Sequence, residues 1–215
     1  MDSFPEPIYL IFILGILGLV PFVAMMATTF VKIAIVLSLL RNALGVQQIP
    51  PNMAVNGLAI ILSAYIMAPV GQAIFDELTV EEIPWESPVE FKEKIAKSLE
   101  PYQAFLIKHT LPAEREFFVA SAIKLWPKEM AESVKDTDLM VLIPAFTVSE
   151  LTAAFEIGFL IYLPFLVIDL IISNILLAMG MMMVSPMTIS LPFKLLLFVL
   201  IDGWTRLIHG LVLSY

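Results

Sequence analysis

The chain has 215 residues, of which 60% are hydrophobic and 15% are charged, and its mean hydropathy is +0.92. This composition lies outside the range of soluble globular domains and indicates a membrane protein. The net charge of −8 speaks against nucleic acid as a partner, and the absence of cysteine excludes a disulfide framework, a thiolate nucleophile and cysteine-based metal sites.

The first predicted membrane helix runs from Ile8 to Val31. These 24 residues carry no charge, and a helix of that length crosses a hydrocarbon core of about 30 Å. Acidic residues precede the run and no small-residue cleavage site follows it, so we predict an uncleaved helix and not a signal peptide. Pro21 falls inside it, where a break is tolerated if neighbouring helices or water satisfy the freed carbonyl.

Two basic residues, Lys32 and Arg41, flank a second apolar stretch that Pro50 and Pro51 should end. The next predicted span covers 57–75. The positive-inside bias places the Lys32 and Arg41 side in the cytoplasm, and therefore the N-terminus and the segment after residue 75 outside. Residues 1–75 thus form a predicted N-terminal region of hydrophobic helices.

The middle segment, residues 76–138, holds 14 acidic and 8 basic residues and is predicted to be a small soluble helical segment. The tetrapeptide 87–90, Ser-Pro-Val-Glu, is typical of a capping box with proline at the first helical position. Apolar residues follow it at helical spacing: Phe91, Ile95 and Leu99. A second helix is predicted over 112–125, and its expected buried side consists of Phe117, Phe118, Ser121 and Leu125.

The last region, residues 139–215, is apolar but contains scattered charges. A charge at membrane depth is costly, so each should face a bundle interior, a partner or a wet cavity. Asp169 with Lys194 is one possible pair between helices. The candidates for buried charge pairing are Glu150, Glu156, Asp169, Lys194, Asp202 and Arg206.

Two membrane spans are predicted in this region, over 156–177 and 191–213. Pro144 and Pro164 are expected to break the helices here, as in transport proteins whose interrupted helices line a path. Asp202, Arg206 and His209 follow each other at spacings that share one helical face, which predicts an ion pair within the last helix.

A methionine tract, Met181, Met182 and Met183, stands between Gly180 and Pro186. Consecutive residues cannot all lie on one helical face, and the flanking glycine and proline indicate a turn in which successive side chains project together. Methionine is unbranched and polarisable, so such a cluster suits a seal around contacts of changing shape. The competing interpretation is ordinary gap filling between helices.

The chain carries no recognisable catalytic motif. The two histidines stand 100 residues apart, no H-E-x-x-H zinc motif occurs, and neither G-x-S-x-G nor a P-loop is present. We therefore predict a protein that is not an enzyme, with no cofactor and no metal.

Two stretches of the sequence carry a resemblance to a known family. They are RNALGVQQIPPN and FEIGFLIYLPFLVIDLIISNILLAMGMMMVSPMTISLPFKLLLFVLIDGW. In them the chain closely resembles the FliP/SctR family of the type III secretion export apparatus, which flagella and virulence injectisomes share. The resemblance extends from about residue 22 to the C-terminus and is weakest over 81–100. Flagellar members commonly carry a cleavable signal sequence, so its absence here favours the injectisome SctR branch.

The resemblance implies an all-α fold: integral membrane-type helical hairpins with broken helices and a small soluble segment. Several copies, pentamer-like in arrangement, would assemble with SctS (FliQ-like) and SctT (FliR-like) subunits into a helical spire. The spire would sit in membrane lipid of the bacterial inner membrane, project to the periplasmic side and pass unfolded secreted proteins. An SctU (FlhB-like) subunit and the inner rod are further expected partners. In this family the loop at Met181, Met182 and Met183 forms a gasket that narrows the pore.

The alternative interpretation is a subunit of a small-solute secondary transporter or channel, which interrupted helices and buried charges also fit. A transporter should contain an internal repeat of helices, and none is evident between 8–75 and 140–215. A third class, an intramembrane hydrolase, would need an identifiable nucleophile or metal site.

Overall fold

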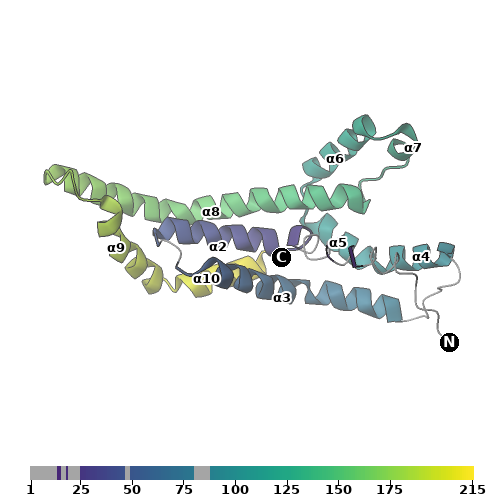
Figure 1. Ribbon diagram of the computed structural model, residues 1–215, viewed down its shortest axis with the longest axis horizontal. Coiled ribbons are helices and arrows are strands. Elements are labelled where there is room, and N and C mark those ends of the chain that lie inside the picture. Colours follow the sequence, from purple (N-terminus) through teal and green to yellow (C-terminus); the bar gives the residue numbers. More distant parts are fainter. Residues whose placement is uncertain (1–13, 16–17, 19–24, 47–48, 80–87) are drawn as a thin grey trace.

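A computed structural model describes residues 14–15, 18, 25–46, 49–79 and 88–215 (Figure 1). Every regular element within these ranges is an α-helix, which confirms the all-α prediction. The span predicted over 8–31 lies mostly outside the described residues, and its described end forms a turn at 27–29. The helices are α2 (Phe30–Leu44), α3 (Asn52–Thr79), α4 (Pro88–Ser98), α5 (Glu100–His109), α6 (Pro112–Leu125), α7 (Lys128–Ala131), α8 (Leu139–Ala178), α9 (Pro186–Leu200) and α10 (Gly203–Leu213).

Helix α8 is the axis of the fold. It has 40 residues and is therefore about 60 Å long, twice the thickness of a hydrocarbon core. In Figure 1, α2 lies along its middle, α9 turns back from one end, and α6 and α7 lie at the other. The helix continues through Pro144 and Pro164, so the predicted breaks there are wrong. Each proline removes one backbone hydrogen bond, and an apolar helix with packed neighbours tolerates that loss.

Helix α2 ends earlier than the sequence suggested. Gly45 adopts the left-handed conformation (φ 74°) and its N–H bonds to the carbonyl of Asn42, which terminates the helix before the two prolines. With 15 residues, α2 is about 22 Å long. Lys32 and Arg41 lie near opposite ends of this helix, and the orientation that the positive-inside bias gives stays a prediction.

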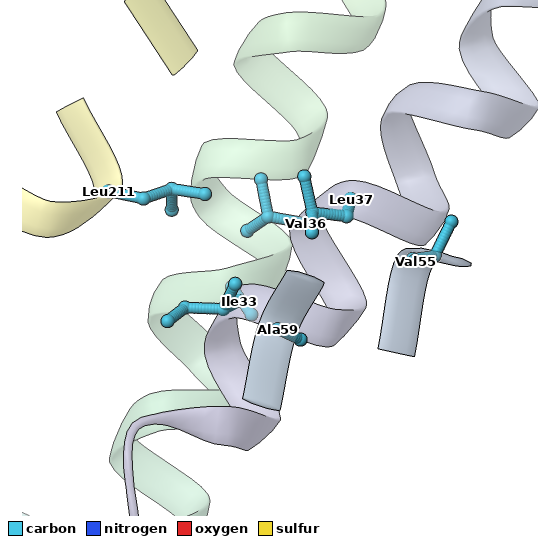
Figure 2. Packing of buried hydrophobic residues seen from close by; sticks show 7 residues of the cluster. Ile33, Val36, Leu37, Val55, Ala59 and Leu211 are labelled. Atoms are coloured by element: carbon cyan, nitrogen blue, oxygen red, sulfur yellow. The ribbon is translucent and has the colours of Figure 1, made fainter. Parts of the chain in front are cut away.

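The main hydrophobic cluster joins α2 to three other helices, and Figure 2 displays its buried residues. Gly158 of α8 permits the closest approach: a Cβ added there would lie 2.2 Å from Cδ1 of Leu39. A larger residue at that position would have to displace the side chain of Leu39. The buried members of the cluster are Ile33, Val36, Leu37, Val55, Ala59, Ala154 and Leu211.

The predicted last span, 191–213, is divided. Helices α9 and α10 meet at an angle of 60°, with Asp202 between them in the left-handed conformation (φ 52°). Gly203 fits against the ring of Phe198 so closely that an added Cβ would stand 2.2 Å from it. Asp202 is not inside a helix and no ion pair joins it to Arg206 in the described part of the chain, so the pair predicted within the last helix is wrong.

The middle segment forms the predicted helices with a partly different buried side. Helix α6 has the predicted bounds, Pro112–Leu125, and α4 begins at Pro88 as predicted, although Ser87 and the side chain of Phe91 lie outside the described residues. Phe117 and Leu125 are 60% and 80% exposed, so the predicted buried side of α6 is wrong for these two residues, whereas Phe118 and Ser121 are half-buried. Ala122, one turn after Phe118, is buried, and α6 packs against α8 and α7.

Among the described residues, two helices are long and apolar enough to cross a membrane, α3 and α8, and the bent pair of α9 and α10 makes a third if it counts as one span. Few residues of α3 and α8 are buried inside the chain, and large apolar side chains line their outer surfaces. The chain is therefore a multi-pass membrane protein by length and composition, and most of its apolar helical surface faces outward.

Candidate functional site: the methionine loop and two buried ion pairs

The methionine tract occupies the turn between α8 and α9, at the far end of α8. Gly180 leaves the helix in the left-handed conformation (φ 74°), and Pro186 opens α9. Met182 is 82% exposed and Met183 fully exposed. Three flexible apolar side chains thus project from the tip of a helical hairpin without forming part of this chain's core.

Behind the loop, one lysine ties three helices together. The Nζ of Lys194 on α9 lies 2.6 Å from Oδ2 of Asp169 on α8 and donates to the carbonyl of Ala43 on α2, 3.0 Å away. The hydroxyl of Ser190 donates to the other oxygen of Asp169 over 2.6 Å. The lysine side chain is 3% exposed and the aspartate 28%. This cluster, which we call the loop staple, holds the α8–α9 hairpin against the end of α2.

A second polar cluster lies toward the other end of α8. Lys32 on α2 and Glu150 on α8 form an ion pair of 3.3 Å between side chains that are 6% and 4% exposed. The hydroxyl of Tyr215 donates to Oε2 of Glu150, and the Nζ of Lys32 lies 3.6 Å from the centre of the Tyr215 ring. We call these three residues the tyrosine cluster. Sequence reasoning missed Lys32 and Tyr215 as partners, although the rule that a buried carboxylate needs a cation predicts a partner for Glu150.

His109 of α5 closes the tyrosine cluster on its outer side. Its ring lies 4.7 Å from the ring of Phe105 and 5.2 Å from that of Tyr215, measured between centroids. Its Nε2 is buried and makes no hydrogen bond among the described residues. Burial, together with the charges of Lys108 and Lys32, lowers the pKa of His109 to about 4, so the imidazole is neutral near pH 7.

Nearby, Tyr102 of α5 forms a hydrogen bond to the turn that precedes α2. Its hydroxyl donates to the carbonyl of Ala27 over 2.7 Å, and burial raises the pKa of this phenol to about 12. The group therefore stays a neutral donor throughout the physiological pH range.

The remaining predicted charges are not brought together. Glu156, Asp202 and Arg206 are exposed, and within the described part of the chain none of them takes part in an ion pair. Their pairing stays a prediction about contacts with other subunits. The described residues also contain no cluster of three histidine or acidic side chains that could hold a metal ion.

Comparison with known proteins gives a consistent answer over the full length. Residues 13–211 match the FliP family. The chain is 63% identical over 215 residues to the Yop proteins translocation protein R of Yersinia pestis, covering 100% of this chain and 99% of that protein. It is 50% identical over 214 residues to the virulence protein YscR of Salmonella typhimurium, with 99% of each covered. It is also 50% identical over 206 residues to the hypersensitivity response secretion protein HrcR of Ralstonia nicotianae, with 93% of each covered. The chain belongs to the FliP family, in its injectisome SctR branch.

Proposed function

We propose that this chain is a pore-forming subunit of the type III secretion export gate. Several copies, pentamer-like, combine with SctS-type and SctT-type subunits to pass unfolded proteins across the bacterial inner membrane. An SctU-type subunit and the inner rod complete the expected contacts. The protein is a structural subunit of this apparatus and not an enzyme.

The relatives support the general role. They are named as translocation, secretion and virulence proteins, and their alignment with this chain is essentially end to end. A component of a protein secretion apparatus is the role these names share.

The observation that carries the finer proposal is the exposure of the methionine loop. Met182 and Met183 lie at the tip of a hairpin that the loop staple fixes from behind, yet they touch little of their own chain. In a ring of copies, one such loop from each subunit would converge on the axis. Flexible apolar side chains there would exclude water and ions and still yield to a passing polypeptide.

Single-channel conductance of the purified assembly tests this. Changing Met181, Met182 and Met183 together to alanine should raise the resting conductance, because the plug is removed while α8 and α9 stay intact. A matched control changes three exposed methionines away from the loop, Met53, Met130 and Met140, to alanine. The control should leave the resting conductance unchanged.

Particle size is measured in parallel. An unchanged resting conductance in a well-assembled loop variant would refute the gasket. Failure of the loop variant to assemble, when the control assembles, would favour ordinary packing of the methionines between subunits. A small-solute transporter, the alternative function, would instead bind or exchange a solute, and no observation in the structure favours it.

For the membrane arrangement, we propose the three regions 1–75, 76–138 and 139–215, with the middle one in the periplasm. The orientation rests on two basic residues. Arg41 lies near the C-terminal end of α2, where it bonds to the carbonyl of Pro50, whereas Lys32 is buried in the tyrosine cluster. Cysteine placed at the exposed position Lys128 should react with an impermeant thiol reagent in intact spheroplasts. Reaction only after lysis would reverse the orientation.

A further inference from the structure

A large apolar cavity lies where the chain bends between α9 and α10. Its volume is about 580 Å³, which falls within the range of about 300–1,000 Å³ typical of small-ligand sites. Helices α9 and α10, which meet at an angle of 60°, both line it, and Phe198 packs against Gly203 at the bend. Helices α2 and α8 supply the opposite wall through Leu40, Ile157, Ile161 and Phe165.

Arg206 is the one charged residue in the lining. It is exposed, and no carboxylate of the described residues forms an ion pair with it. Asp202, one turn earlier in the chain, lies in the bend between α9 and α10 and does not form an ion pair with Arg206. An arginine in an apolar helical region of a membrane protein needs an anion or water, and no carboxylate within the described ranges serves as that anion. The cavity therefore combines a long apolar space with an unpaired guanidinium.

We propose that this cavity binds an anionic phospholipid, with an acyl chain in the apolar space and the phosphate on Arg206. Guanidinium donors match phosphate oxygens and can bond two of them at once. The cavity lies between α8, a helix long and apolar enough to span a membrane, and the bent pair α9–α10, which passes the same test, so phospholipid can reach it wherever these helices lie in a bilayer. An amphiphilic molecule matches both parts of the site, because its acyl chain can pack against the apolar lining and its charged headgroup can pair with Arg206. This inference does not depend on the pore role.

The chain offers a clean fluorescence test. Of its three tryptophans, Trp204 stands next to Gly203 of the cavity, so Trp85→Phe and Trp126→Phe leave a single reporter. Phosphatidylglycerol with a brominated acyl chain, titrated into the purified full-length chain in detergent, should quench Trp204 in a saturable way. Brominated diacylglycerol, which has the same acyl chains but no phosphate, should bind about tenfold more weakly, the ratio that corresponds to one charge-assisted contact.

Two substitutions separate the headgroup from the acyl chain. Arg206→Gln should remove the preference for phosphatidylglycerol and leave weak binding of both lipids. Gly210→Leu should weaken both, because Gly210 lines the cavity and a side chain added there meets only open space. The matched control is Gly71→Leu on α3, which is equally unobstructed and lies outside the cavity, and it should bind as the parent does.

Several results would overturn the proposal. Equal affinity of the two lipids for the parent chain, or an unchanged preference in Arg206→Gln, would refute recognition of the phosphate. Normal binding in Gly210→Leu would refute the acyl-chain site. The alternative is that Glu156 of a second copy pairs with Arg206. Because the chain contains no cysteine, a disulfide between Arg206→Cys and Glu156→Cys copies, mixed and oxidised, would report this contact. Efficient cross-linking in the assembled complex would assign the cavity to protein.

Discussion

The two polar clusters beside α8 differ in how complete they are within one chain. In the tyrosine cluster, Lys32 and Glu150 are almost fully buried, and an aromatic ring and a hydroxyl from Tyr215 complete their environment. In the loop staple, Lys194 is equally buried but Asp169 retains partial access to solvent. Beyond the staple, the methionine loop has almost no contacts of its own.

On the proposed assembly, this difference predicts which end of α8 other subunits would contact. At the end of α8 near the middle segment, the buried charges find their partners within a single chain: each other, the Tyr215 ring and the Tyr215 hydroxyl. The loop end exposes apolar side chains at the tip of a hairpin, and exposed apolar surface of this kind is typical of interaction sites. The predictions below measure how far the two ends differ.

The largest effect is expected for Glu150→Ala. This substitution leaves Lys32 buried without a counter-charge, and breaking a buried pair in this way costs about 3–5 kcal/mol. Purified yield and thermal unfolding in detergent measure the loss. The control removes an exposed ion pair by Lys97→Ala, which separates Lys97 from Glu77 and should cost less than about 1 kcal/mol.

The double variant Lys32→Met with Glu150→Leu sharpens this result. Replacing both charges by apolar side chains of similar size should restore most of the lost stability, since neither partner is left unpaired. A double variant as unstable as Glu150→Ala would mean that the carboxylate acts through another contact, such as the hydroxyl of Tyr215.

Lys194→Ala should destabilise the chain less, by about 1–3 kcal/mol, because the abandoned Asp169 is partly exposed and can take up water. Assembly of the complex should nevertheless suffer more than in the surface variant Lys135→Ala. Size-exclusion chromatography of the co-expressed complex compares the two. Equal yields would contradict a structural role for the staple.

Gly158 lies between the two ends, where α8 packs against Leu39 of α2. Gly158→Ala should destabilise the chain by about 1–2 kcal/mol, because the added methyl group must displace Leu39. Gly71→Ala, on an exposed and unobstructed part of α3, should instead stabilise it by up to about 1 kcal/mol through higher helix propensity. Thermal unfolding of both should therefore shift in opposite directions, and parallel shifts would argue against the close contact.

The smallest effect concerns pH and His109. Its pKa is about 4 in the fold and about 6.5 in an unfolded chain, so above pH 6.5 both states are neutral and the residue has no influence. Between pH 6.5 and 4 the unfolded chain binds the proton first, and stability falls by about 1 kcal/mol, a value reduced because the imidazole is only half-buried. His109→Phe should flatten the pH dependence of the unfolding temperature over that window. An unchanged slope would assign the acid sensitivity to other groups.

The sequence by itself determined the helical class, the membrane character and the family. A mean hydropathy of +0.92 and long uncharged runs leave few alternatives to membrane helices, and the stretch around Met181 to Met183 carries the family resemblance. Local signals also fixed the bounds of α6, because proline at its first position and the Trp126–Pro127 pair at its end act within a few residues.

The tertiary structure decided the partners and the continuity of the helices. Proline predicted breaks in α8 that packing overrides, whereas the break at Asp202 has no proline and depends on Gly203 fitting against Phe198. The sequence identified Glu150 as a charge that needs a partner but could not select Lys32, 118 residues away, or Tyr215, because such a pairing depends on how α2 and the end of α10 pack against α8. Periodicity and turn signals act over one or two helical turns, and the choice of contacts between distant helices is made by the whole packed bundle.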